Sequence, residues 1–211
     1  MPSALRRALP NAITVGRLVL AATFFVMADR IDRTAPDVET TGFVAGILFA
    51  IAAATDVLDG YLARRWKVVS VFGRLMDPLV DKVLVLGGFI YLASPAFAPL
   101  DSPPMQGSGI AAWMVVVILV REFLVTGLRS YAEARGIAFG ADWGGKIKMV
   151  VQSFCIPWCV FAATRTDPAD GTLLLRDIAI WTTMAATILS AVSYVLRAMK
   201  LPIDAADGAA A

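Results

Sequence analysis

Six long apolar runs, separated by short polar stretches, dominate the pattern of this chain. Each run is close to the roughly 20 residues that an α-helix needs to cross the hydrocarbon core of a bilayer. None alternates like a barrel strand, and a spanning segment must satisfy its own backbone hydrogen bonds. The pattern therefore predicts an all-α integral membrane protein with six transmembrane helices, at about residues 11–28, 42–63, 75–96, 110–131, 146–164 and 177–198.

The segments outside these runs are short, so we expect one domain over residues 11–200. Residues 1–10 are typical of an amphipathic segment at the membrane surface, and Pro10 and Asn11 are expected to open the first helix. The Pro-, Ser- and Gly-rich stretch from Pro95 to Gly109 predicts an irregular loop. Residues 201–211 are small and polar, which predicts a flexible tail.

Lysine and arginine residues are distributed unequally between the two sets of loops. They gather before the first run and after the second, fourth and sixth runs, whereas the loop after the third run has none. The positive-inside rule assigns the basic loops to the cytoplasm. We therefore expect both termini, and the polar residues that follow the second and fourth runs, to be cytoplasmic.

The composition excludes several classes of function. The chain is 58% hydrophobic with a net charge of only +2, so it does not suggest a nucleic-acid-binding protein. It contains no histidine, which excludes Ser-His-Asp and Cys-His triads and histidine-ligated zinc. Cys155 and Cys159 lie four residues apart in an apolar run and are expected to pack as small apolar side chains.

Four carboxylates flank the junction between the second and third runs. Asp56 and Asp59 share one helix face, and Asp77 and Asp81 share another. Unit charges about 4 Å apart repel by about 4 kcal/mol at an effective dielectric of about 20, so four can converge only if protonated, paired or metal-bound. Oxygen ligands without His or Cys favour Mg²⁺, Mn²⁺ or Ca²⁺. The alternative is that each aspartate is a helix cap or a solvated loop residue.

Two further polar groups interrupt apolar runs. Asn11, Thr14 and Arg17 form a stripe on the first run, which either faces a polar cavity or consists of caps and a snorkelling arginine. A later basic set could line a cytoplasmic anion site, and it comprises Arg121, Arg129, Lys146 and Lys148. Its members also have structural explanations, because Arg121 could pair with Glu122, and lysines are common anchors at membrane interfaces.

The acidic stretch reads Asp56-x2-Asp59-Gly60-x2-Ala63-Arg64-x8-Gly73-x3-Asp77-x3-Asp81. It resembles the signature of the CDP-alcohol phosphatidyltransferases at every fixed position. The resemblance implies the fold of that family and a multi-pass protein of the bacterial inner membrane with its active site facing the cytoplasm. It also implies a homodimer and two bound divalent cations, Mg²⁺ or Mn²⁺.

Residue roles follow from the same resemblance. Asp56, Asp59 and Asp77 correspond to metal ligands, and Asp81 corresponds to the catalytic base, which also contacts the second metal. The implied CDP-lipid site comprises Asn11, Thr14, Arg17, Asp56, Asp59, Gly60, Ala63, Arg64 and Gly73. Small side chains there would leave room for the cytidine and its phosphates, and Gly73 would let two helices approach closely.

Two further strings, Arg121–Arg129 and Trp143–Gln152, are similar to one branch of the family, the phosphatidylglycerophosphate synthases. This similarity implies transfer of a phosphatidyl group from CDP-diacylglycerol to glycerol 3-phosphate with release of CMP. Arg121, Arg129, Lys146 and Lys148 would then bind the acceptor phosphate. Inositol phosphate is an alternative acceptor, and phosphatidylglycerol, which would give cardiolipin, is another. A small cation transporter is the alternative of another class, because intramembrane acids also mark ion pathways.

Overall fold

The structure is a computed structural model of the 211-residue chain. It describes the backbone of residues 3–66, 71–101, 104–137 and 143–200. Side chains are described for residues 15–55, 79–101, 105–137 and 143–200.

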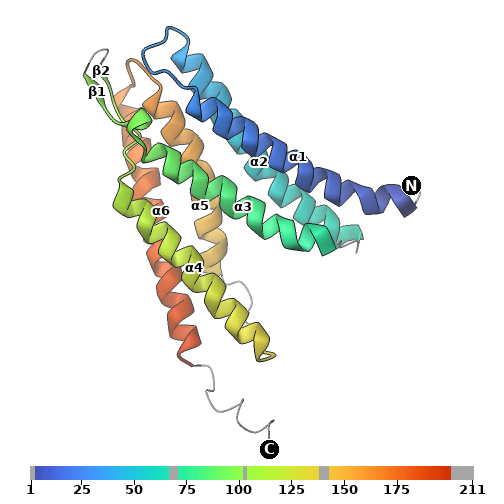
Figure 1. Cartoon of the computed structure of the whole chain (residues 1–211). Coiled ribbons are helices and arrows are strands. Elements are labelled where there is room, and N and C mark those ends of the chain that lie inside the picture. The colour runs from blue at the N-terminus through green and yellow to red at the C-terminus, as the bar shows by residue number, and fades with distance from the viewer. Residues whose placement is uncertain (1–2, 67–70, 102–103, 138–142, 201–211) are drawn as a thin grey trace, which may run out of the picture.

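Six long helices make up the described chain, which confirms the predicted all-α class (Figure 1). Each predicted run corresponds to one helix, with ends that differ by up to eight residues. The helices are α1 (Ser3–Asp29), α2 (Val38–Trp66), α3 (Val71–Leu92), α4 (Ala112–Ala134), α5 (Trp143–Ala163) and α6 (Asp170–Ala198).

The start of the first helix was predicted wrongly. α1 begins at Ser3 and continues through Pro10 and Asn11, so these residues do not open it. The preceding residues are mostly Ala, Leu and Arg, which favour helix. Proline is tolerated inside membrane helices because neighbouring groups satisfy the freed carbonyl. A proline is therefore a weaker boundary signal here than in a soluble helix.

The connection between α3 and α4 is more ordered than predicted. It contains a short 3₁₀ helix, η1 (Pro95–Phe97), and two antiparallel strands, β1 (Leu100–Asp101) and β2 (Pro104–Met105). Leu100 lies opposite Met105 in this hairpin. The expectation of an irregular loop from Pro95 to Gly109 was thus wrong for these residues.

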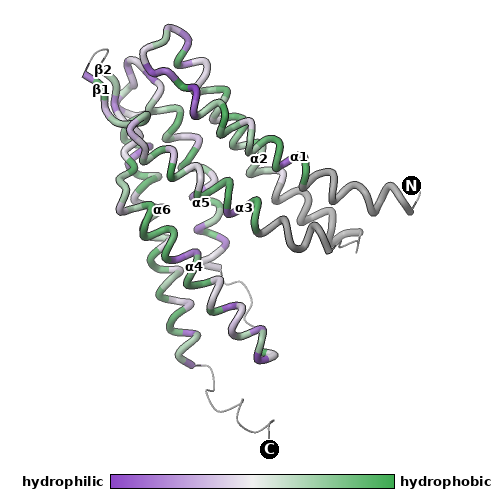
Figure 2. Tube along the Cα trace, viewed as in Figure 1, coloured by the Kyte–Doolittle hydropathy of each residue, from purple (hydrophilic) through white to green (hydrophobic). Residues whose placement is uncertain are grey.

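Three of the described helices are long and apolar enough to cross a membrane by themselves, namely α2, α5 and α6. α3 and α4 carry charged residues within their apolar sequence, including Asp81, Lys82, Arg121 and Glu122. Figure 2 shows hydrophobic residues along the middle of the helices and hydrophilic residues at the connections. Many large apolar side chains are exposed, as on a lipid-facing surface.

Aromatic side chains fill the core between α1, α2 and α3. Phe24 packs edge-on against Phe49, with ring centroids 5.1 Å apart. Phe25 stacks on Tyr91 and also lies against Gly87, where a Cβ would come within 2.4 Å of the Phe25 ring. The missing side chain of Gly87 therefore allows α1 and α3 to approach closely.

Cys155 and Cys159 are free thiols in the same core and are fully buried. Their sulfur atoms are 3.8 Å apart, a thiol–thiol hydrogen bond and not a disulfide, and their full burial agrees with the expected packing as small apolar side chains.

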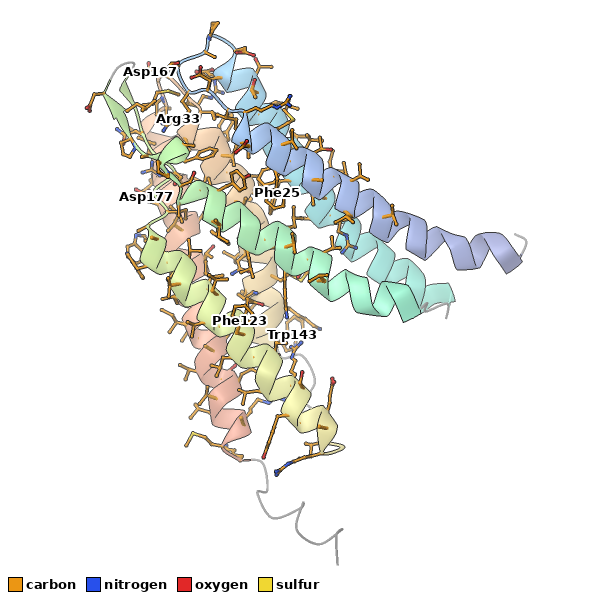
Figure 3. All side chains as sticks on the ribbon, viewed as in Figure 1. Phe25, Arg33, Phe123, Trp143, Asp167 and Asp177 are labelled. Carbon is orange, nitrogen blue, oxygen red and sulfur yellow. The ribbon has the colours of Figure 1, made fainter. Side chains whose placement is uncertain are left out.

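A buried arginine ties together the connections at one end of the bundle (Figure 3). Arg33 is 4% exposed and donates to the backbone carbonyls of Ala163, Ala98 and Gln106, at the end of α5 and on both sides of the β1–β2 hairpin. Burial lowers the pKa of Arg33 from its ordinary value. One guanidinium group thus holds three chain segments at the end where α1 leads into α2.

Replacing Arg33 by methionine should destabilise the protein by about 3–5 kcal/mol, because three carbonyls lose a charged donor in a buried place. Tryptophan fluorescence during thermal unfolding in detergent micelles would measure the loss. Arg30→Met, at an exposed position three residues away, is the matched control and should change the melting temperature little. Equal effects of the two substitutions would show that the Arg33 hydrogen bonds do not stabilise the fold.

Candidate active site

The four predicted acids lie near the adjoining ends of α2 and α3. Asp56 and Asp59 lie in the last three turns of α2, while Asp77 and Asp81 lie in the first three turns of α3. Only four residues separate these helices, so their ends are less than about 20 Å apart. The structure describes the side chain of Asp81 alone among the four.

Asp81 lines a pocket of about 400 Å³ between α3, α4 and α5. Its lining carries five cationic and three anionic side chains. The cations are Lys82, Arg121, Arg129, Lys146 and Lys148, and the acids are Asp81, Glu122 and Glu133. The four basic residues singled out in the sequence therefore lie around one pocket, together with the predicted base.

Glu122 is the centre of a buried charge cluster at this pocket. One of its carboxylate oxygens accepts hydrogen bonds from Arg121 at 2.9 Å and from Lys148 at 2.5 Å. The three side chains are 13%, 7% and 10% exposed, respectively. Buried charges are stable only when paired and hydrogen-bonded, so Glu122 allows the two cations to remain charged between α4 and α5.

α6 supplies further partners for the two arginines. Arg121 donates to the Ser190 hydroxyl at 2.5 Å, and Arg129 donates to the Tyr194 hydroxyl. Tyr194 is fully buried, and both guanidinium groups lie over its ring, 5.7 and 5.2 Å from the centroid. Side chains on one face of α6 thus contact the guanidinium groups of both arginines.

Two further lysines of the pocket lining, Lys82 and Lys146, lie outside the Glu122 cluster. Lys82, next to Asp81 in the sequence, donates to the Thr126 hydroxyl of α4 at 2.7 Å. Lys146 is exposed and lies over the Trp143 ring, 5.0 Å from the centroid. This contact fits the interfacial anchor considered from the sequence, while Lys146 also lines the pocket.

The structure resolves two of the alternatives left open by the sequence. Arg121 pairs with Glu122 and also lines the pocket, so its structural pairing is compatible with the predicted anion site. Arg17 is 1% exposed, so its guanidinium group is inside the protein rather than snorkelling to the surface.

The remaining predicted site residues lie in helices, but their side chains are outside the described set. They are Asn11, Thr14, Asp56, Asp59, Gly60, Ala63, Arg64, Gly73 and Asp77. Their assignment as CDP-lipid or metal-binding residues stays a prediction.

The sequence reasoning missed Lys82, Ser190 and Tyr194. A signal existed for the last two, because Thr183, Thr187, Ser190 and Tyr194 recur at helical spacing on an otherwise apolar run. All four are at most 2% exposed in α6. A polar stripe of this kind on a spanning helix indicates the face that is turned toward the protein interior.

The donor chemistry of the region fits hard divalent cations. Carboxylates are the only strong anionic ligands that α2 and α3 bring to their adjoining ends, and the chain has no histidine. Among the described side chains, no three His, Cys, Asp or Glu residues gather as a metal cluster. A metal site would therefore require Asp56, Asp59 and Asp77 to join Asp81.

A comparison with known protein families matches residues 7–189 to the CDP-alcohol phosphatidyltransferases. This match covers most of the chain, including the acidic stretch and the pocket. The chain belongs to the CDP-alcohol phosphatidyltransferase family. This confirms the resemblance seen in the acidic signature, and it identifies the protein as a transferase.

Several bacterial relatives carry the name CDP-diacylglycerol–glycerol-3-phosphate 3-phosphatidyltransferase. The Bacillus subtilis protein is 32% identical over 88% of this chain and 92% of its own. The Mycoplasma pneumoniae protein is 28% identical over 93% of this chain and 88% of its own. The Haemophilus influenzae protein is 29% identical over 82% and 86%. The three matches each cover between 82% and 93% of this phosphatidyltransferase.

Replacing Glu122 by glutamine should destabilise the protein by about 3 kcal/mol, because two buried cations lose their shared counter-charge. Thermal unfolding in detergent micelles measures this change. Glu133→Gln removes an exposed carboxylate from the same helix and the same pocket, and it should alter the melting temperature little. A Glu122→Gln protein as stable as the unmodified one would contradict the role of the charge cluster.

Proposed function

We propose that this phosphatidyltransferase transfers the phosphatidyl group of CDP-diacylglycerol to glycerol 3-phosphate, forming phosphatidylglycerophosphate and CMP. The observation that carries the proposal is the pocket in which Arg121, Arg129, Lys146 and Lys148 surround the same space as Asp81. A phosphorylated alcohol needs cations for its phosphate and a base for its hydroxyl. Both lie around this one pocket.

The charge of the pocket favours a doubly charged phosphate monoester. Five cations against three carboxylates leave the lining positive. Arginine forms paired hydrogen bonds with phosphate oxygens, which gives geometric selectivity as well as affinity. Relatives that span most of this chain are named for glycerol 3-phosphate, which supports this acceptor over others.

Asp81 is suited to act on the acceptor hydroxyl. We assign it the role of general base, taking the proton as the hydroxyl oxygen forms a bond to the phosphorus that carries the diacylglycerol. The bond from that phosphorus to the CMP oxygen breaks, and CMP leaves. When bound to Asp56, Asp59, Asp77 and Asp81, two divalent cations, Mg²⁺ or Mn²⁺, would stabilise the charge on the departing phosphate.

The same proposal includes the location of the protein. The apolar runs favour six membrane-spanning helices, and the loop charges favour both termini and the pocket on the cytoplasmic side. The family resemblance implies a bacterial inner membrane. Water-soluble glycerol 3-phosphate and CMP could then exchange with the cytoplasm while the acyl chains stay in lipid. A homodimer is expected from family resemblance.

The alternatives are two other acceptor substrates and one other class of protein, a cation transporter. Inositol phosphate would be attracted by the same cations, whereas phosphatidylglycerol needs fewer of them. A cation transporter would require acids along a spanning path, but the predicted acids lie near the adjoining ends of α2 and α3.

The acceptor can be identified directly. Purified protein in detergent–CDP-diacylglycerol micelles with Mg²⁺ should convert labelled glycerol 3-phosphate into a labelled lipid, and it should not convert labelled inositol phosphate or phosphatidylglycerol. Turnover only with inositol phosphate, or only with phosphatidylglycerol, would refute the proposed acceptor.

Replacing Arg129 by alanine should raise the KM for glycerol 3-phosphate by about 10–100-fold and change the KM for CDP-diacylglycerol little, because a charged hydrogen bond to one substrate is lost. Arg135→Ala is the matched control, since Arg135 at the end of α4 lies over the Tyr131 ring and outside the pocket. An unchanged acceptor KM in Arg129→Ala would remove this residue from the acceptor site.

Asp81→Asn should lower the rate of CMP release by at least about 100-fold, because an amide cannot take the acceptor proton. Melting temperature is the check that the variant folds, and Asp101→Asn, on the β1–β2 hairpin, is the control. Intact CMP release in Asp81→Asn, with loss of divalent-ion flux in liposomes, would instead support the transporter.

A further inference from the structure

We infer that Tyr194 is a positioning residue for the acceptor site, holding Arg121 and Arg129 in the orientation that binds the acceptor phosphate. The inference rests on the proposed function, because it concerns the same pocket. Tyr194 itself does not line the pocket, although it contacts two residues that do. Its effect on the substrate would therefore be transmitted through the arginines.

The first argument is the convergence of cations on this one ring. Arg121 and Arg129 come from α4, and Arg197 from α6, and all three guanidinium carbons lie within 5.8 Å of the ring centroid. The face of an aromatic ring attracts cations, and the attraction grows when water is excluded. Tyr194 is 0% exposed, so the ring interacts with these charges away from bulk water.

The second argument is that the hydroxyl makes a directional contact as well. Arg129 donates from Nη2 to the Tyr194 oxygen, and Arg121 donates from Nη2 to Ser190, one turn earlier on α6. Each contact fixes one edge of a planar guanidinium group. Among the described residues, the side-chain partners of Arg121 and Arg129 use only part of the Nη donors of each, so the remaining Nη–H groups can meet a phosphate.

The third argument concerns the free energy of binding. A long arginine side chain loses rotamer freedom when it orders on a ligand, and an arginine that is already held does not lose it again. The contacts of α6 therefore favour acceptor binding without touching the acceptor. The contribution is specific to the substrate that uses Arg121 and Arg129, so CDP-lipid binding should be insensitive to it.

Tyr194→Phe tests the inference because it keeps the ring and removes only the hydroxyl. The KM for glycerol 3-phosphate should rise by about tenfold, the typical effect of losing a hydrogen bond to a charged group. kcat and the KM for CDP-diacylglycerol should stay within about twofold. Tyr131→Phe is the control, because Tyr131 is an exposed tyrosine on α4 with Arg135 over its ring.

A double-mutant cycle separates positioning from general structural support. In an Arg129→Lys background, the hydroxyl has lost its guanidinium partner, so adding Tyr194→Phe should raise the acceptor KM little further. Ser190→Ala provides a second variant that acts on Arg121 alone, and it should also raise only the acceptor KM. Melting temperatures report whether each variant folds.

The outcomes distinguish this inference from the proposed function. Absence of turnover of glycerol 3-phosphate by the unmodified enzyme would overturn the proposed acceptor, and this inference with it. Turnover by the unmodified enzyme, with unchanged acceptor KM in both Tyr194→Phe and Ser190→Ala, would overturn the inference alone. Fully additive effects of Tyr194→Phe and Arg129→Lys, or equal losses for both substrates, would do the same.

Discussion

The carboxylate of Glu122, shared by Arg121 and Lys148, is the interaction on which the pocket depends. Two cations between closely packed apolar helices would repel each other and lose most of their hydration. The carboxylate of Glu122 lies between the two cations and binds both, which also joins α4 to α5. The pocket can therefore remain positive overall within a largely apolar bundle, which is the property that an anionic acceptor requires.

The bundle has two ends of different character. At one end, Arg33 joins three chain segments, and Glu39 at the start of α2 binds Arg165 and Thr166 after α5. At the other, α4 and α6 run away from α1, α2 and α3, and charged side chains gather between α3, α4 and α5 (Figure 1). The contacts at the first end join chain segments to one another, whereas the second end presents the charged pocket that we propose as the acceptor site.

Much of this arrangement could be predicted because bilayer thickness constrains helix length. The six apolar runs identified the six long helices of the described residues, and basic residues in two separate strings were correctly expected to come together. The start of α1 was missed because Pro10 is tolerated inside the helix. Tyr194 was missed because a tyrosine near the end of a spanning helix is common at membrane interfaces, and only packing shows it beneath Arg129. The roles of the four aspartates remain predictions.

The tied end has a mechanical consequence for the distant pocket. Arg176 of α6 donates to the Gly107 carbonyl near that end, and Tyr194 lies about 27 Å further along the helix axis at 1.5 Å per residue. α6 is thus anchored by Arg176 to the segment that follows the β1–β2 hairpin, at a point far from Tyr194. A tilt of about 5° about this anchor would shift Tyr194 by about 2 Å, enough to break its hydrogen bond to Arg129. A firm anchor at the hairpin end would therefore help to keep the distant contact between Tyr194 and Arg129 in place.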